Sequence, residues 1–341
     1  MKKAMVCMAL TLCLAAVSRE QVFNMADGVA GAVRDAFQPQ DDAGGADATI
    51  TFEEQLGVMQ NRSVLDITLY YRFAGTDMLG MQPAQLDMRR EETVASSIVQ
   101  ALIDGPDAGH DRLAGVFPQG TSLISVAGSG ATAFVTLSRA FLGKPDGAPS
   151  DWEDIPAWQE EAALRRRLAV QSITLALTDG GRYQRVQLYV ADSDDDVPER
   201  IPLMWFGAET VQSSTMLAAC ARDESVLMTP QSAMEVILSA WQARDWAKIY
   251  PLLARGQGED LPTLSAFEAQ MRQTGVSLMA GTVADGAVSV DGQTATLVLD
   301  ASIRSEDGGD AQIERESVPL VRDADNWAIR LSTLMSLMIR E

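Results

Sequence analysis

The sequence predicts an α+β protein that consists of two successive modules. Between residues 64 and 191, hydrophobic residues recur with period two or period 3.6, in the order strand, helix, two strands, helix, strand. Between residues 226 and 341, two helical patterns precede four runs with strand character, which is the order expected when helices pack against a curled antiparallel sheet. The chain has 341 residues, 47% of them hydrophobic, and is long enough to form a core in each module.

The segment before the first module has the features of an export signal and a tether. Lys2 and Lys3 precede an apolar stretch over residues 4–17, which ends in small residues. Because a membrane-spanning helix needs roughly 20 apolar residues, we expect residues 1–18 to be a cleaved signal peptide, with an uncleaved anchor or a lipid-anchored form as alternatives. Residues 19–63 are rich in Gly, Asp, Ala and Gln without sustained periodicity, which indicates a flexible tether.

In the first module, turn residues separate the predicted elements. Residues 67–73 alternate as in a half-buried strand, and residues 91–104 have helical spacing. Gly105 is placed to end this helix in a left-handed conformation, and Pro106 prevents its continuation. The remaining predicted elements are a turn at 117–121, strands at 122–126 and 131–138 around a loop at 127–130, a helix at 160–177 and a strand at 185–190.

An acidic stretch separates the two modules. Residues 192–225 begin with DSDDDVPER and are expected to form a linker, within which residues 201–207 have the hydrophobicity of a strand. In the second module, Thr229 and Pro230 suit the N-cap and the first turn of a helix. The predicted elements there are helices at 229–254 and 264–275, followed by strands at 276–283, 294–303, 311–321 and 326–334.

The charge of the chain restricts its partners. The formal net charge is −20 at pH 7, and removal of residues 1–18 would make it more negative still. Such a chain repels nucleic acid and anionic lipid headgroups, both of which bind Lys and Arg clusters. The basic run at residues 164–168 is expected to be a solvated helix face. Only Cys220 remains after signal cleavage, so neither an intrachain disulfide nor a cysteine-based metal site is expected.

Residues suited to catalysis or metal binding are sparse in this sequence. We expect His110, the single histidine, to be solvated in a loop, because no Ser-His-Asp or Cys-His arrangement can be built on it alone. The acidic run at 192–196 lacks the central glycine and trailing glutamate of a calcium loop and is interpreted as a solvated linker. In the second module, Asp300 is the carboxylate that could act as an acid or base in catalysis. We therefore predict no catalytic residue, no cofactor and no metal site, in a protein that is not an enzyme.

The first module contains four short motifs in a set order. They are LYYRFAGTDMLGMQP at 69–83, VQALIDGP at 99–106, VFPQGTSL at 116–123 and ATAFVTLSRAF at 131–141. In order and spacing they resemble the GerMN domain of bacterial sporulation and spore-germination proteins, where they form an opening strand with an acidic loop, a helix end, a turn and a closing strand. Around Leu175 and Thr178 the sequence departs from the family pattern.

This resemblance implies structural roles for particular residues and a class of function. The motif residues are expected to set backbone turns and to close strands: Leu102, Gly105, Pro106, Pro118, Gly120, Thr121, Leu137 and Ser138. Family members are extracytoplasmic, resemble ring-building domains of cell-envelope assemblies and are not enzymes. The resemblance thus implies an exported protein that acts through its surface.

Residues 226–341 resemble the nuclear-transport-factor-two-like fold. The resemblance is carried by VILSAWQARDWAKIYPLLA at 236–254 and by NWAIRLS at 326–332. It implies a cone-shaped arrangement of helices and a curved antiparallel sheet, which can enclose a cavity. The residues expected to line such a cavity are Trp241, Trp246, Phe267, Met279 and Trp327.

Two functions of different classes follow from this sequence. The first is a non-catalytic, extracytoplasmic assembly or scaffold protein of the cell envelope, linked through the resemblance to sporulation or spore germination. Its partners would be other envelope proteins or further copies of itself. The alternative is an envelope protein that binds a small ligand in the C-terminal cavity. Neither function involves nucleic acid, and membrane contact is expected only through an N-terminal anchor if the signal is not cleaved.

Overall fold

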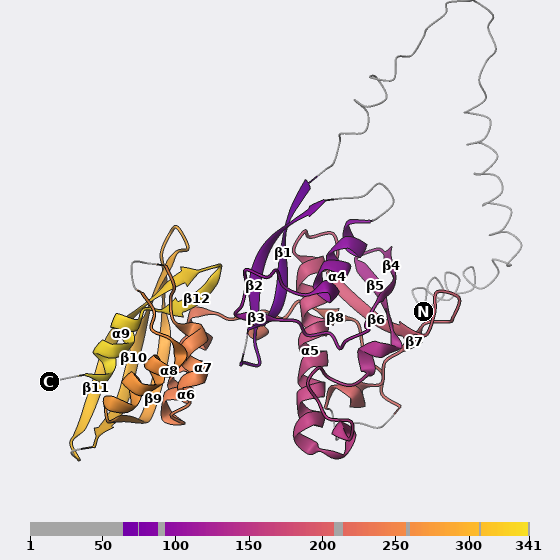
Figure 1. Cartoon of the computed structure of the whole chain (residues 1–341). Helices are drawn as coiled ribbons and strands as arrows, with labels where there is room; N and C mark the ends of the chain where they lie inside the picture. The colour runs from indigo at the N-terminus through magenta and orange to yellow at the C-terminus, as the bar shows by residue number, and fades with distance from the viewer. Residues whose placement is uncertain are drawn as a thin grey trace, which may run out of the picture. The chain divides into compact units, whose positions relative to one another are not determined.

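The structure is a computed structural model (Figure 1) that describes residues 64–73, 75–87, 93–207, 214–256, 260–306 and 308–339. The predicted signal peptide at 1–18 and tether at 19–63 lie outside the described residues. Within the described ranges, no helix has both the length and the apolar character needed to cross a membrane.

A long antiparallel hairpin opens the first module. β1 (Val64–Phe73) pairs with β2 (Leu79–Asp87), and β3 (Leu113–Ala114) joins the other edge of β1 near its end. The strand predicted at 67–73 is thus confirmed and extended. The acidic loop expected after Phe73 is wrong over residues 79–83, which begin β2. Hydrophobic alternation fails in LGMQPAQLD, so the pattern gave no strand signal there.

The second sheet of this module has the strand order β4-β5-β6-β7, and β8 pairs with β6. β4 (Leu123–Ser129) and β5 (Thr132–Ser138) form a hairpin whose strands extend to Ser129 and Thr132, so most of the loop expected at 127–130 is strand. β5 and β6 (Arg185–Ala191) are parallel. Parallel strands need a crossover connection, which α5 (Pro156–Thr178) provides.

Apolar faces of two helices contribute to the core of this module. α4 (Val94–Asp104) begins at the N-cap Thr93, whose side chain accepts a hydrogen bond from Ser96 N. Ile98, Val99 and Leu102 are buried on its inner face. α5 begins with Pro156 in its first turn and packs against β1 and β6. Both helices were predicted, and α5 is longer than expected.

The stretch expected to be a linker contributes to the second sheet. β7 (Glu199–Arg200) and β8 (Cys220–Ala221) both pair with β6. The strand expected at 201–207 is wrong, because Leu203–Phe206 form a 3-10 helix, η4, that ends at the left-handed Gly207. The other 3-10 helices of the described residues are η2 (Arg139–Leu142), η3 (Trp152–Asp154), η5 (Glu224–Val226) and η6 (Tyr250–Leu252).

The C-terminal module is a curled antiparallel sheet with helices beside it (Figure 1). Its strands are β9 (Val276–Val288), β10 (Thr294–Ser305), β11 (Asp310–Asp323) and β12 (Asn326–Ile329), in the order β12-β11-β10-β9. α6 (Pro230–Gln242) packs mainly against β9, followed in the chain by α7 (Trp246–Ile249) and α8 (Leu264–Gln273). The predicted α+β class is confirmed.

Two predicted elements of this module are divided in the structure. The helix expected at 229–254 ends at Gln242, because Arg244 has a positive φ of 56° and Asp245 caps the new helix α7. The strand expected at 326–334 ends at Ile329, and Leu331–Met338 form α9. In both places the hydrophobic pattern continues along the sequence, but a change of backbone conformation ends the helix or strand.

Candidate functional site

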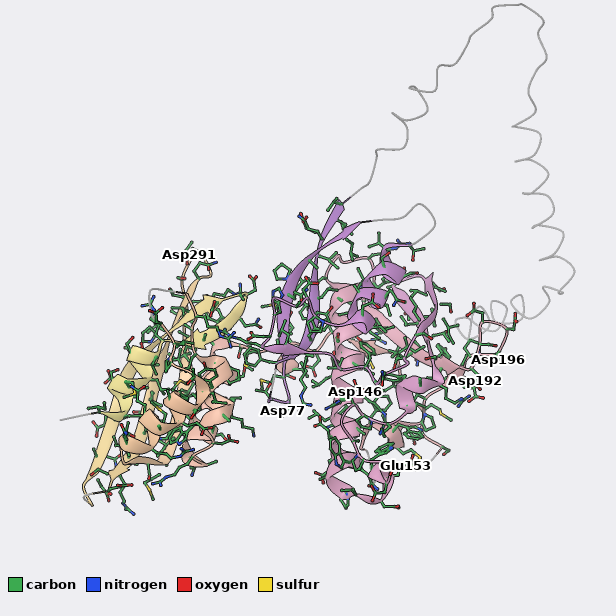
Figure 2. All side chains as sticks on the ribbon, viewed as in Figure 1. Asp77, Asp146, Glu153, Asp192, Asp196 and Asp291 are labelled. Carbon is green, nitrogen blue, oxygen red and sulfur yellow. The ribbon has the colours of Figure 1, made fainter. Side chains whose placement is uncertain are left out.

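The two predicted bends of the first module border one surface hollow. This hollow of about 720 Å³ is lined by Gly105 and Pro106 after α4 and by Pro118, Gly120 and Thr121 of the next turn. The structure therefore brings these five residues together, which the sequence did not predict. The charged residues at the hollow are Asp104, Lys144 and Asp146; Figure 2 labels Asp146.

Local hydrogen bonds hold the second bend. Thr121 donates to Pro118 O from its backbone N at 3.1 Å and from its Oγ1 at 2.7 Å. Gln119 N donates to Asp146 Oδ1 at 3.0 Å. Gly120 has a φ of 84°, a conformation that favours glycine because it has no Cβ. The polar groups of this turn thus bond to one another. The hollow therefore presents mainly its shape and its backbone groups, and few titratable side chains.

The first bend is tied to β1. Tyr71 is fully buried, and its hydroxyl lies 2.9 Å from Ala101 O and 3.0 Å from Gly105 O, two carbonyls at the end of α4. Gly105 has a φ of 93° and a ψ of 178°, so the left-handed helix cap expected there is wrong. The backbone is extended with a positive φ, which still requires glycine.

The other motif residues lie in the core or in the β4–β5 hairpin. Leu102 and Leu137 are fully buried. Ser138 accepts a hydrogen bond from Ser122 N on its Oγ at 2.9 Å and donates its own backbone N to Ser122 O at 2.9 Å. These residues close the sheet and do not line the hollow, although Ser138 Oγ donates to Gly120 O, at the hollow, at 3.4 Å.

The residues expected to line a C-terminal cavity do not share one open surface. Trp241, Trp246, Phe267 and Trp327 are buried in the hydrophobic core, whereas the side chain of Met279 is 46% exposed. Trp241 Nε1 donates to Val276 O at 3.4 Å, which ties α6 to the start of β9. Four of these five side chains are therefore core residues of the C-terminal module.

The remaining candidates for chemistry occupy separate places. His110 has a buried Nδ1 for which the described residues supply no hydrogen-bond partner. Asp300 Oδ1 accepts a hydrogen bond from Arg315 N at 2.8 Å. Asp192 and Asp196 lie on the exposed loop after β6 (Figure 2), where Asp192 forms an ion pair with Arg139. Within the described residues, no group of three or more His, Cys, Asp or Glu side chains could hold a metal ion.

One residue of the basic run at 164–168 departs from the expected solvated face. Arg166 is buried, and its guanidinium lies between the rings of Trp152 and Trp205, at 5.7 and 4.9 Å from their centroids. Arg166 Nη2 donates to Leu142 O at 2.8 Å. Burial lowers the pKa of Arg166 to about 10. Periodicity on a long helix could not show that η2, η3 and η4 cover this position.

Polar contacts between the two modules were missed by the sequence reasoning. Asn326 Oδ1 accepts Met81 N at 3.0 Å, and its Nδ2 donates to Met81 O at 3.2 Å. Arg112 Nη2 donates to Leu253 O at 2.8 Å and to Asp323 Oδ2 at 2.7 Å. The partners lie far apart in the chain, so no local pattern could have paired them.

The comparison with family models identifies the first module. Residues 68–196 match the family described as "Germane: Sporulation and spore germination". This segment is a Germane domain. It covers less than half of the chain and contains both bends, the hollow and the complete motif set.

Solved structures with similarity to the chain are remote. The tandem GerMN domains of the sporulation protein GerM from Bacillus subtilis are 14% identical over 55% of this chain and 51% of that chain, with a TM-score of 0.32. The first GerMN domain of the same protein is 17% identical over 38% of this chain and 84% of that chain, with a TM-score of 0.25. This chain thus spans about half the length of the tandem-domain structure. No curated protein matches the chain.

Proposed function

We propose that this chain is a non-catalytic, exported assembly or scaffold protein of the cell envelope that acts in sporulation or spore germination. The observation that carries the proposal is the Germane domain at residues 68–196, whose family is described by that process. For the C-terminal module we propose a nuclear-transport-factor-two-like fold, supported by its curled sheet and the helices beside it.

The local geometry of the Germane domain supports a role through surface and shape. At the hollow, Asp146 Oδ1 accepts a hydrogen bond from Gln119 N at 3.0 Å. Asp104 accepts a hydrogen bond from Gln100 Nε2 at 2.7 Å. A partner would therefore meet a hollow whose form is set by backbone turns. The acidic chain also favours a partner with a positively charged surface.

Light scattering after size-exclusion chromatography of the full chain, together with crosslinking in the cells that produce it, tests this proposal. We expect either an oligomer or a recovered partner protein. Asp104→Lys reverses an exposed negative charge at the hollow and should weaken the crosslinked complex with a positively charged partner. Glu235→Lys reverses an exposed negative charge on α6 of the C-terminal module and should not. A strict monomer at high concentration, with no crosslinked partner, would argue against a scaffold.

A further inference from the structure

Among the described residues, one edge of β1 has no strand partner before Arg72. β2 pairs with β1 from Val64 to Arg72, but among the described residues β3 occupies the opposite edge only at Arg72 and Phe73. A strand edge without a partner presents backbone N–H and C=O groups that can pair with another chain. The part of β1 without a strand partner is therefore a candidate site for pairing with another chain.

The hydrogen bonds of β2 show which backbone groups point to this open edge. Met81 stands opposite Tyr70, and its N and O both bond to Asn326, so they point away from β1. Tyr70 and Met81 are thus a non-hydrogen-bonded pair, and Tyr70 O points away from β2, where it accepts Ser172 Oγ at 2.5 Å. Because this orientation alternates along a strand, the backbone groups of Thr68 and Asp66 also face the open edge.

Pro83 supports the same assignment. It stands opposite Thr68 and has no backbone N–H. Proline fits in a strand where its nitrogen faces away from the neighbouring strand, so Thr68 and Pro83 are also a non-hydrogen-bonded pair. Two independent observations therefore direct the backbone of Thr68 away from β2.

An apolar groove follows this edge. It has a volume of about 490 Å³, and Asp66 and Thr68 of β1 contribute to its lining. Val94 and Ile98 of α4 and Leu177 of α5 supply apolar walls. Apolar side chains are also exposed along the groove: Leu65 and Val94 are each 38% exposed. Exposed apolar groups beside an open strand edge are typical of a site that adds a strand from a partner.

We propose that this groove binds an extended, apolar segment of a partner protein that pairs with the open edge of β1 and carries a basic residue. The inference rests on the proposed assembly function and names the kind of partner. A helix does not fit this site, because its backbone groups are already bonded within the helix. The added strand would point alternate side chains toward α4 and toward α5, since successive side chains of a strand face opposite sides.

Charge decides between a partner segment and a second copy of this chain. Asp66 and Asp179 border the groove, but Asp179 forms an ion pair with Arg222 at 2.5 Å. Arg182 also borders the groove and lies over the ring of Tyr183 at 5.3 Å, so Asp66 is the acid that a basic residue of a partner can reach. A second copy would bring another formal charge of −20 and a second Asp66 to the same edge. Like charges opposite one another on paired strands are unfavourable, so a basic segment suits the groove better.

Selection of a displayed library of random nine-residue peptides on the immobilised full chain tests this inference. We expect enrichment of peptides with alternating apolar residues and at least one Lys or Arg. A synthetic enriched peptide should lose binding, measured by fluorescence anisotropy, when its alternate backbone nitrogens are methylated, because methylation removes the N–H donors and leaves the side chains unchanged. Equal binding of the methylated peptide would overturn the proposal.

A pair of matched variants locates the peptide on the protein. Val94→Gln places an amide in the apolar wall and should raise the Kd at least about ten-fold. Val290→Gln makes the same change at a fully exposed position of the C-terminal module and should leave the Kd within about two-fold. Unchanged binding by Val94→Gln, no enriched peptide, or a dimer that Val94→Gln disrupts would each overturn the proposal. Crosslinked complexes that persist in Val94→Gln would show that assembly does not depend on this groove. The proposed assembly function would then remain, and the groove would have no part in it.

Discussion

At the scale of single residues, two adjacent tyrosines tie β1 to the two helices of the Germane domain. Tyr70 Oη donates to Asp179 Oδ2 at 2.7 Å at the end of α5, and Tyr71 Oη bonds to carbonyls at the end of α4. Burial is the main cause that raises the pKa of both phenols well above its ordinary value, and nearby carboxylates add to the rise. Both side chains must therefore be protonated in the folded protein.

This shift predicts a loss of stability at alkaline pH. An unfolded tyrosine ionises near pH 10, whereas the folded phenols stay protonated, so the stabilisation is complete below about pH 10 and is lost as the pH rises above it. Urea unfolding between about pH 8 and pH 11 should show this decline. Tyr71→Phe should flatten the decline and, at neutral pH, lower the free energy of unfolding by about 1 kcal/mol. An unaltered pH dependence in Tyr71→Phe would contradict this account.

Tyr189→Phe is the matched control for this experiment. Tyr189 lies half-buried in β6, and no hydrogen bond of the described residues involves its hydroxyl. Its removal should leave the alkaline decline as it is in the unchanged protein.

At the scale of elements, the bends depend on backbone conformations that few residues adopt. Gly105→Ala would place a Cβ on a residue with a φ of 93° and a ψ of 178°, and should cost about 1–3 kcal/mol in the free energy of unfolding. Gly109 lies in the same loop without a positive φ and with open space around it, so Gly109→Ala should be neutral or stabilising by about 0.5 kcal/mol. Chemical denaturation measures both. Equal effects of the two changes would show that the bend has no special backbone requirement.

At the scale of the whole molecule, Asn326 joins the Germane domain to the C-terminal module. Its side chain is buried and bonds to both backbone groups of Met81. Gly80 leaves room for it, because a Cβ there would lie 2.5 Å from Asn326 Oδ1. The joint therefore needs a particular residue on each side.

Removal of this joint should reduce cooperativity. Asn326→Ala leaves backbone groups of Met81 without partners and should cost about 2 kcal/mol. We expect differential scanning calorimetry to show one main transition for the unchanged chain and a broadened or divided transition for Asn326→Ala. Gln100→Ala, which removes an exposed hydrogen bond within α4, is the control and should leave a single transition. A single, equally sharp transition in both variants would show that the modules do not depend on this contact.

The sequence predicted those elements whose hydrophobic pattern agrees with their burial. β5 is an example: Ala133, Val135 and Leu137 alternate in the sequence and are fully buried in the structure. Pattern failed at β2, where the buried Gln82 interrupts the hydrophobic alternation and donates to Asp107, and at α9, where a hydrophobic run continues while the backbone changes from strand to helix. Periodicity in the sequence shows only which face of one element is buried. The conformation of these two segments depends on contacts with residues that are distant in the chain.

The sequence by itself determined the α+β class, the two bends and the Germane motif, because each depends on residues close together in the chain. Only the tertiary structure decided that both bends border one hollow, that Arg166 is buried between two tryptophans and that Asn326 holds Met81. It also decided which edge of β1 stays open beside an apolar groove. The physical reason is that turns and amphipathic faces arise from local backbone preference, whereas buried polar contacts and open strand edges arise from the packing of separate segments.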